Sequence, residues 1–391
     1  MLRSLYSGIS GLRAHQTMLD VTGNNIANVN TPGFKASSVR FEDTLSQTLQ
    51  GANAPAAGQG GTNPAQVGLG VQTAAISVDF TPGSRQTTGR GLDLAISGDG
   101  FFVVQDGTGN QLYTRDGALD FDGAGRLVTS EGAIVLGWPA VNGVVDTQAP
   151  LGPVTLPATA TSPARATDAA TMGGNLPADA AVGTALSYDV TVYDGLGQAR
   201  TLTMTFTRTA AGWDVSGADG SATATGAITF DADGQLASGG TLAVGGVSVD
   251  LSGLTGFAQL QTVKFTNQNG FEPGTLQSYS LGSDGSLVGS FSNGTTQVLG
   301  QIAVATFTNP AGLEKVGGST YRPTLNSGAL NLEVAGTAGA GAIVPGSLEM
   351  SNVDLSKEFT NLIVAQRGFQ ANARVITTSD EVLQKLTNLK R

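Results

Sequence analysis

The residues that could carry acid–base, nucleophilic or metal chemistry are scarce in this sequence. Its 391 residues include a single histidine, His15, and no cysteine. With no second imidazole and no thiol, histidine-based metal sites, thiol catalysis and disulfide bonds are excluded. His15 lies two residues after Arg13, where a surface position on a helix is enough to explain it. We therefore predict that the chain has no catalytic residue and is not an enzyme.

Two acidic loops superficially resemble the opening of a calcium-binding loop: Asp120-Phe121-Asp122-Gly123 and Asp231-Ala232-Asp233-Gly234. Both overlap a recurrent pattern of an apolar residue, Gly and Leu, found at 121–127, 230–236 and 281–287, which indicates β-hairpins. The glycine pairs at Gly68-Leu69-Gly70 and Gly98-Asp99-Gly100 precede neither a helix nor a Lys-Ser/Thr pair, so they do not predict a phosphate site. We expect no metal and no cofactor.

Composition and charge narrow the class of protein further. The chain has 56 glycines and only 13% charged residues, which favours β-strands joined by many tight turns. Its net charge of −10, without any run of Lys or Arg, makes a nucleic-acid partner unlikely. The N-terminus has no uninterrupted apolar region typical of a Sec signal, and no stretch of 18 apolar residues predicts membrane insertion.

Both ends of the chain have the periodicity of amphipathic helices. Over residues 2–26, apolar residues recur at spacings built from threes and fours: Leu2, Leu5, Ile9, Leu12, Leu19 and Ile26. Near the other end, an apolar residue recurs every seven positions and one more follows: Leu355, Leu362, Phe369, Ile376, Leu383 and Leu386. Ala365, Asn372 and Ser379 are small or polar, which allows a close approach of helices. Ser351 to Asp354 offer N-cap groups for the second helix.

Neither apolar row can be buried by its own helix, so each helix needs a partner. The two ends are expected to lie side by side, with the rest of the chain attached to them. Periodicity alone leaves open whether they pair as a coiled-coil stalk within one chain or pack between copies of the chain.

Between the ends the apolar period changes to two. Residues 186–192 and 202–206 alternate around Asp194-Gly195-Leu196-Gly197, which predicts a hairpin. Further strands are expected at 74–80, 92–96, 101–104 and 301–307, and low-complexity linkers or loops at 50–66, 150–168 and 328–346. The predicted fold class is α+β and multidomain, with paired long terminal helices, coiled-coil-like, around two mainly-β domains. The expected parts are a terminal helical domain (1–30 and 350–391), a linker or extended segment (31–70), an inner β domain (71–145 and 265–349) and an inserted outer β domain (146–264).

The segment that follows the first helix carries a specific resemblance. It reads Asn24, Asn25, Ile26, Ala27, Asn28, Val29, Asn30, Thr31, Pro32, Gly33, Phe34 and Lys35, and it resembles the signature of the rod and hook axial proteins of the bacterial flagellum. Pro32 and Gly33 have a physical role of their own, because they stop the helix and turn the chain. Similar matches occur at 98–104, 113–117, 351–355, 361–367 and 370–373.

The resemblance implies a function as well as a fold. It implies a structural subunit of the flagellar hook, whose terminal helices line a hollow, flexible tube that transmits motor torque as a universal joint and conducts exported subunits. It also implies a homopolymer, further contacts with the rod, the hook cap, the hook–filament junction proteins and the flagellar export apparatus, and an extracellular location reached without a cleaved Sec signal. Two alternatives remain: a rigid distal-rod subunit and a secreted β-rich surface adhesin.

Overall fold

The computed structural model describes residues 2–55, 58, 60–157 and 161–388, except for the side chains of Leu2 and Leu386. The chain divides into two compact units: unit 1 comprises Met1–Leu156, Ser280–Val288 and Val298–Arg391, and unit 2 comprises Pro157–Tyr279 and Gly289–Gln297. Strands β24, β25 and β26 include residues of both units. Compared with the predicted inserted domain, 146–264, unit 2 lacks residues 146–156 and adds residues 265–279 and 289–297.

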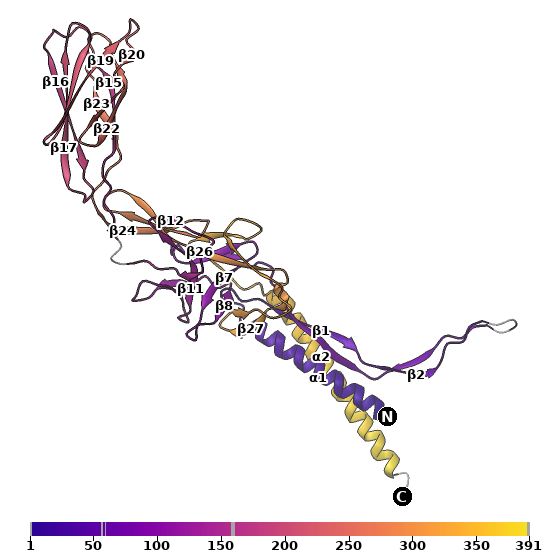
Figure 1. The fold of residues 1–391 in the computed structure, drawn as a ribbon. Helices are drawn as coiled ribbons and strands as arrows, with labels where there is room; N and C mark the ends of the chain where they lie inside the picture. The colour runs from indigo at the N-terminus through magenta and orange to yellow at the C-terminus, as the bar shows by residue number, and fades with distance from the viewer. Residues whose placement is uncertain (1, 56–57, 59, 158–160, 389–391) are drawn as a thin grey trace. The chain divides into compact units, whose positions relative to one another are not determined.

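Unit 1 contains both helices and most of the short strands (Figure 1). Its elements are α1 (Leu2–Ala27), β1 (Ser37–Asp43), β2 (Ser46–Gln50), β3 (Ala65–Gly68), β4 (Val71–Val78), β5 (Arg85–Thr87), β6 (Leu94–Ser97), β7 (Phe101–Gln105), β8 (Gln111–Thr114), β9 (Leu119–Phe121), β10 (Leu127–Thr129), β11 (Ile134–Val141), β12 (Val144–Val145), β13 (Gly152–Pro153), β26 (Thr296–Phe307), the 3-10 turn η1 (Pro310–Gly312), β27 (Glu314–Gly317), β28 (Thr320–Arg322), β29 (Leu330–Val334), β30 (Ala342–Pro345), β31 (Ser347–Glu349) and α2 (Leu355–Asn388).

The helices match their sequence prediction. α1 ends at Ala27, where the Asn28 side chain donates a hydrogen bond of 2.9 Å to the carbonyl of Asn24 and Pro32 follows. α2 begins after Asp354, whose carboxylate accepts hydrogen bonds from the backbone N–H groups of Ser356 (2.8 Å) and Lys357 (3.3 Å). Within the described residues, no helix is both long and apolar enough to cross a membrane.

The core of unit 1 lies on both faces of β7. Phe102 and Val104 pack into one apolar cluster with Leu94, while Phe101 and Val103 pack into a second with Trp138. The sheet around β7 has the order β26-β11-β7-β8-β28-β27. Because both faces are covered, β7 is a continuous apolar run rather than an alternating one.

Residues 37–50 and 65–78 form a long antiparallel hairpin, which we call the β-arm. β1 pairs with β4 from Ser37↔Val78 to Asp43↔Val71, and β2 pairs with β3 beyond them. Within the linker or extended segment expected over 31–70, residues 37–43, 46–50 and 65–68 are therefore hairpin strands. The base of the β-arm lies against α1, where the Ser10 hydroxyl accepts a hydrogen bond of 3.2 Å from the N–H of Val71.

Unit 2 is a β-sandwich. Its strands are β14 (Thr161–Ser162), β15 (Ala169–Asn175), β16 (Ala185–Tyr193), β17 (Ala199–Arg208), β18 (Trp213–Asp219), β19 (Ala222–Phe230), β20 (Leu236–Ser238), β21 (Thr241–Val244), β22 (Val247–Thr255), β23 (Lys264–Gln268), β24 (Gly274–Leu281) and β25 (Ser286–Phe291). One sheet has the order β16-β17-β18-β19-β20 and the other β21-β22-β15-β23.

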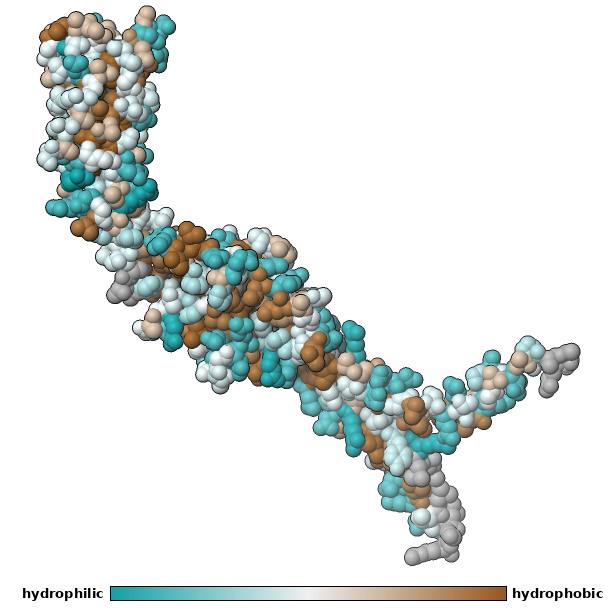
Figure 2. Space-filling view, in the orientation of Figure 1, coloured by the Kyte–Doolittle hydropathy of each residue, from teal (hydrophilic) through white to brown (hydrophobic). Residues whose placement is uncertain are grey.

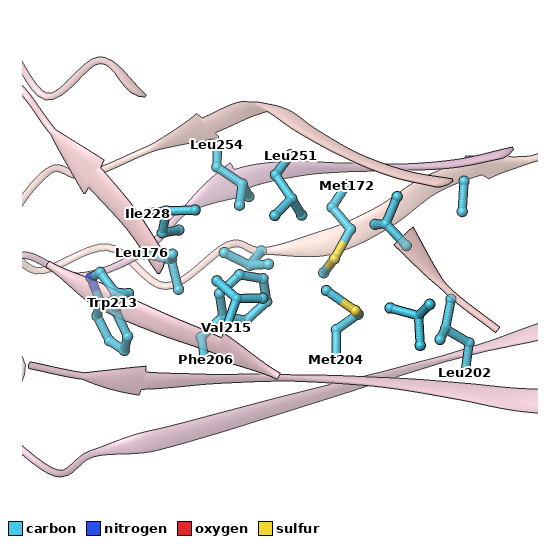
Figure 3. Close-up of a cluster of buried hydrophobic side chains, with 14 of the residues drawn as sticks. Met172, Leu176, Leu202, Met204, Phe206, Trp213, Val215, Ile228, Leu251 and Leu254 are labelled. Carbon is cyan, nitrogen blue, oxygen red and sulfur yellow. The ribbon is translucent and has the colours of Figure 1, made fainter. Parts of the chain in front are cut away.

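The inward-facing residues of the two sheets of unit 2 meet in one buried core. Figure 3 shows Met204 and Phe206 of β17 below Met172 of β15 and Leu251 of β22. The predicted hairpin between β16 and β17 is confirmed, with Ala185↔Thr207 and Tyr193↔Ala199 as its first and last pairs. Its turn is fixed by the Asp194 carboxylate, which accepts hydrogen bonds from the N–H groups of Leu196 and Gln198.

Candidate assembly site

Small residues close the seam between α1 and α2. A methyl group at Gly11 would lie 2.6 Å from the side-chain oxygen of Asn372, and one at Gly8 would lie 3.3 Å from a side-chain carbon of Ile376. Further along, the His15 ring fills the space in front of Gly368. These contacts run in opposite directions along the two helices, which therefore pack antiparallel. Glycine at these positions allows a backbone approach that a larger residue would prevent.

The predicted apolar row of α1 does not form this seam. The buried residues of α1 are Gly8, Gly11, Ala14, Thr22 and Asn25. By contrast, Ile9 is exposed, and Leu5, Leu12, Leu19 and Ile26 are only half-buried. The Leu2 side chain lies outside the described residues. The predicted row thus lies beside the seam rather than in it.

On α2 the predicted row is also incompletely covered. Leu355 and Phe369 are exposed, and Leu362, Ile376 and Leu383 are half-buried, whereas Glu358 and Ala365 are buried. The Leu386 side chain lies outside the described residues. Ala365, which the sequence placed on a close-packed seam, is fully buried.

Sequence periodicity missed a second set of apolar residues on the helices. They do not fall on the seven-residue row, yet they are exposed to solvent: Tyr6, Phe359, Ile363, Val364, Val375 and Val382. The sequence did indicate apolar residues outside the row, because 362–364 is a run of three large apolar residues and only one of them can lie on a single row of a helix. The helix pair therefore carries large apolar side chains outside its own seam.

The β-arm is a further exposed surface with apolar side chains. They are Phe41, Leu45, Leu49, Val67, Leu69 and Ile76. In the region of the helix pair and the β-arm, Figure 2 shows hydrophobic residues reaching the surface among hydrophilic ones. Near its base the arm is held to the helices by the ring of Phe41, which contacts His15 edge to face at 5.8 Å.

The motif segment after α1 turns the chain back onto the helix end. The Asn25 side chain donates a hydrogen bond of 2.8 Å to the carbonyl of Ser37 and accepts one of 3.0 Å from its N–H. Gly33 has a φ of +68°, and a methyl group there would lie 2.5 Å from the backbone nitrogen of Asp116. Phe34 is buried next to it. The motif segment therefore packs against the β region of unit 1 as well as ending α1.

A buried ionic cluster joins three segments that are far apart in the sequence. The Nζ of Lys35 lies 2.6 Å from one carboxylate oxygen of Glu349, and the guanidinium of Arg115 lies 3.3 Å from the other. The same Glu349 accepts a hydrogen bond from the N–H of Gly83, and the Lys35 ammonium donates one to the carbonyl of Thr81. Glu349 ends β31 just before α2, so the cluster ties the exit of α1 to the entry of α2.

Burial dominates the electrostatics of this cluster. It lowers the pKa of Lys35 and of Arg115 despite the attraction of Glu349. It also raises the pKa of Tyr321, whose hydroxyl is buried without a hydrogen-bond partner among the described residues. Two cations share one carboxylate here, and removing that carboxylate would leave both of them uncompensated.

Asn352 makes a second tie between the two helix ends. Its side-chain oxygen accepts a hydrogen bond of 2.8 Å from the N–H of Ala36, and its amide donates to the carbonyls of Asp79 (2.9 Å) and Thr81 (3.1 Å). The sequence interpretation offered this residue only as a capping candidate for α2. Its actual partners are backbone groups of the motif segment and of the strand exit after β4.

An open cleft of about 480 Å³ borders the motif segment. Its walls include Asn24, Asn28, Asp116, Glu131 and Lys315. Burial raises the pKa of Asp116 and lowers that of Lys315, whose ammonium lies 3.9 Å from the centre of the Phe34 ring. No histidine lines the cleft, so its described groups offer polar contacts rather than nucleophilic chemistry.

The acidic loops lie in hairpin turns, as predicted. Glu131 stands eleven residues after Asp120, the spacing of an EF-hand's closing ligand, but it lies against Gly318 instead. Asp120 pairs with Arg90 at 2.9 Å, and Asp122 accepts hydrogen bonds from the N–H groups of Ala124 and Arg126. Within the described ranges, no group of three His, Asp or Glu residues could hold a metal ion.

Four family models match separate parts of the chain, including both terminal regions. They are described as "Flagella basal body rod protein" (residues 5–35), "Flagellar hook protein FlgE/F/G D1 domain" (95–167), "Flagellar basal body protein FlaE D2 domain" (155–271) and "Flagellar basal body rod FlgEFG protein C-terminal" (344–389).

Individual relatives match over nearly their whole length. The chain is 38% identical to the flagellar hook protein FlgE of Borreliella burgdorferi, covering 100% of both chains, and 38% identical to that of Salmonella typhimurium, covering 99% and 100%. It is 36% identical to the flagellar basal-body rod protein FlgG of Bacillus subtilis, covering 100% of both. The crystal structure of Helicobacter pylori flagellar hook protein FlgE2 has a similar fold, with a TM-score of 0.52 at 15% identity, covering 69% of this chain and 100% of that one. The chain therefore belongs to the family of bacterial flagellar hook and basal-body rod proteins, whose members are structural parts of the flagellum.

Proposed function

We propose that this chain is the structural subunit of a flagellar hook and that it self-assembles through its terminal helices. Copies of the chain form a hollow, flexible tube, which bends while it transmits torque from rod to filament and conducts exported subunits. The subunit is exported without a cleaved Sec signal and lies outside the cell. By family resemblance its other partners are the rod, the hook cap, the hook–filament junction proteins and the export apparatus.

One observation carries the assembly role. α1 and α2 meet through Gly8, Gly11 and Gly368, while large apolar side chains such as Phe359 and Val364 remain exposed. A side chain of this size contributes about 1.5–3 kcal/mol when it passes from exposed to fully buried. Contacts between copies are the natural way to bury them, because the seam within the chain is already closed.

The same observation predicts how the free subunit behaves. A helix pair with a narrow seam and exposed apolar flanks buries little apolar surface, so its stability in isolation is low. We expect the helices to be weakly protected in the free subunit and to become ordered when neighbouring copies cover them.

A distal-rod subunit is the second candidate. The rod relative is 36% identical, close to the 38% of the hook relatives, so the choice of the hook rests on the more numerous and more similar hook proteins. A rod is a rigid drive shaft and a hook is a bending joint. Electron microscopy of polymers grown from purified subunits distinguishes them: curved tubes support the hook, and uniformly straight ones support the rod.

A secreted β-rich adhesin with a helical stalk is a third, less favoured candidate. Such a protein would use its helices within one molecule and would not form tubes. Its failure to polymerise under any condition would separate it from both flagellar candidates.

The proposal is tested by placing a charge on the exposed apolar surface. Val364 is 52% exposed, so Val364→Asp leaves the isolated chain folded but places a carboxylate in the contact between copies, where burial without a partner is unfavourable. We expect this variant to form no tubes. Val182→Asp is a matched control, because Val182 is 72% exposed and lies in unit 2. Normal tubes from Val364→Asp would overturn the proposed interface.

A further inference from the structure

A cavity of about 200 Å³ lies where the C-terminal half of α1, the start of α2 and the base of the β-arm meet. Its walls include Thr22, Ser37, Asp79, Lys357 and Glu358. All of them belong to unit 1. The cavity does not include the ionic cluster at Glu349. The contacts described above for the motif segment and the helix seam do not involve its two acidic residues, Asp79 and Glu358.

Glu358 is the unusual member of this cavity. It is 7% exposed, yet its carboxylate has no hydrogen-bond or ion-pair partner among the described residues. Asp79 accepts a hydrogen bond from the N–H of Thr81 and likewise forms no ion pair within the described part of the chain. Asp79 is exposed, and no oxygen of Glu358 or Asp79 is both fully buried and without a hydrogen-bond partner, so both carboxylates are open to the cavity. The cavity therefore presents two carboxylates that no described cation pairs with.

Lys357 lines the same cavity but does not supply that cation. Its side chain is exposed, and its ammonium forms no ion pair with any described carboxylate. Its charge acts on Asp79 from a distance and helps to lower the pKa of that carboxyl, which the N–H of Thr81 lowers most. Glu358 therefore has no ion-pair partner among the described residues.

An unpaired cation lies elsewhere on α2. Arg367 is exposed and has no acidic partner among the described residues. It follows Ile363 and Val364 by one helical turn, so it projects from the apolar surface that assembly would bury. Burying that surface without an anion for Arg367 would be unfavourable. Arg374 lies one heptad after Arg367, but the residues one turn before and after it on α2, Gln370 and Thr378, are polar rather than apolar.

We propose that the cavity at Glu358 is a socket for the guanidinium of Arg367 from a second copy of the chain. This inference rests on the proposed assembly through the helices. Arg367 cannot enter the socket of its own chain: it lies about 13.5 Å further along α2 than Glu358 and about half a turn around it. A guanidinium presents a planar fork of donors that matches carboxylates, and the socket offers two, Glu358 and Asp79. The pair fixes the axial offset between neighbouring helices.

Thiol cross-linking tests the contact directly, because the natural chain has no cysteine. An Arg–Glu pair holds its two Cα atoms further apart than a disulfide allows, so the double variant Glu358→Cys/Arg367→Cys is treated with a bismaleimide cross-linker rather than oxidised. From assembled tubes we expect a ladder of covalent dimers and larger species on a denaturing gel, and from unassembled subunits only monomers. Glu358→Cys/Arg374→Cys is the matched control. Tubes that form but give no ladder, or a ladder from the Arg374 pair alone, would refute the socket.

A second measurement needs no change inside the cavity. Arg367→Gln alters an exposed side chain and leaves the fold intact, and we expect it to raise the subunit concentration needed for assembly about tenfold. Glu358→Gln should have an effect of similar size, and the double variant should add little to either. Arg374→Gln and Lys357→Gln are controls with changes of less than about twofold. If wild-type subunits form tubes and Arg367→Gln assembles equally well, the socket is wrong while the proposed function stands; if wild-type subunits form no tubes, the function itself fails.

Discussion

The ammonium of Lys35 lies 2.6 Å from the carboxylate of Glu349, although the two residues are separated by 314 positions in the sequence. One residue follows the end of α1 and the other precedes the start of α2. Both side chains are almost completely buried, at 0% and 1% exposed. A contact of this kind holds the two helix ends at one place in unit 1, so that a load on either helix reaches the strands through the same cluster.

Removing the shared carboxylate should weaken unit 1 strongly. In Glu349→Gln, Lys35 and Arg115 lose their counter-charge inside the protein, and breaking a buried pair costs about 3–5 kcal/mol. Urea unfolding of the unassembled subunit measures this, with the transition of unit 2 as an internal reference. Glu314→Gln, which breaks the exposed pair with Arg322, should cost no more than about 1 kcal/mol. Equal losses from both variants would show that the cluster is not the structural joint described.

Two glycines of α1 should respond to alanine in opposite directions. Gly11→Ala places a methyl group 2.6 Å from the Asn372 amide, so that side chain must shift and lose its hydrogen bond to the carbonyl of Gly368, which should lower the temperature at which tubes dissociate. Gly23 has no neighbouring atom within 4 Å of the added methyl group. Gly23→Ala should therefore stabilise the helix by about 0.5–1 kcal/mol. A rise in dissociation temperature for both variants would argue against the close seam.

The buried Asp116 should make the stability of the folded chain depend on pH in a defined direction. Burial raises its pKa in the folded chain above the ordinary 3.8, so the stability linked to its protonated form is present below pH 3.8 and lost as pH rises through the raised value. Asp116→Asn keeps the oxygen that accepts the N–H of Ala118 and removes the charge. Its stability relative to wild type should increase between about pH 4 and pH 7 in urea titrations.

Asp122 provides a control of opposite sign for that titration. The N–H of Arg126 lowers the pKa of Asp122, so its contribution to stability is present above pH 3.8 and lost as pH falls through the lowered value. Asp122→Asn should therefore be less stable than wild type at pH 7 and approach it in acid. If both variants drift in the same direction, the assigned environments are incorrect.

Local patterns in the sequence predicted the elements well. Both helices begin and end close to their predicted residues because apolar periodicity, Asp354 and Pro32 act locally. The strand at 301–307 and the hairpin at 194–197 follow from period-two patterning and turn chemistry. The resemblance to flagellar axial proteins and the prediction of a structural, non-enzymatic protein are confirmed by the family.

The same local patterns could not predict contacts between residues far apart in the sequence. Glu349 has no motif around it, and only the folded chain brings it to Lys35 and Arg115. On α2 the small or polar positions Ala365 and Asn372 lie in the seam as the sequence indicated, but the facing glycines of α1, such as Gly11, were not identified. The sequence predicted a linker or extended segment over 31–70 and a strand at 74–80, but not that β1 and β4 pair into one hairpin, because their partners lie about 30 to 40 residues apart. How these surfaces are used between copies remains a prediction.

Amide hydrogen exchange on the free subunit and on assembled tubes is the most direct measurement of the central claim, that neighbouring copies cover the terminal helices. We predict fast exchange over residues 2–27 and 355–388 in the free subunit and strong protection of the same amides in the tube, with little change in the core strands of unit 2, such as β17 and β18. Strong protection of both helices already in the free subunit, unchanged on assembly, would contradict the account.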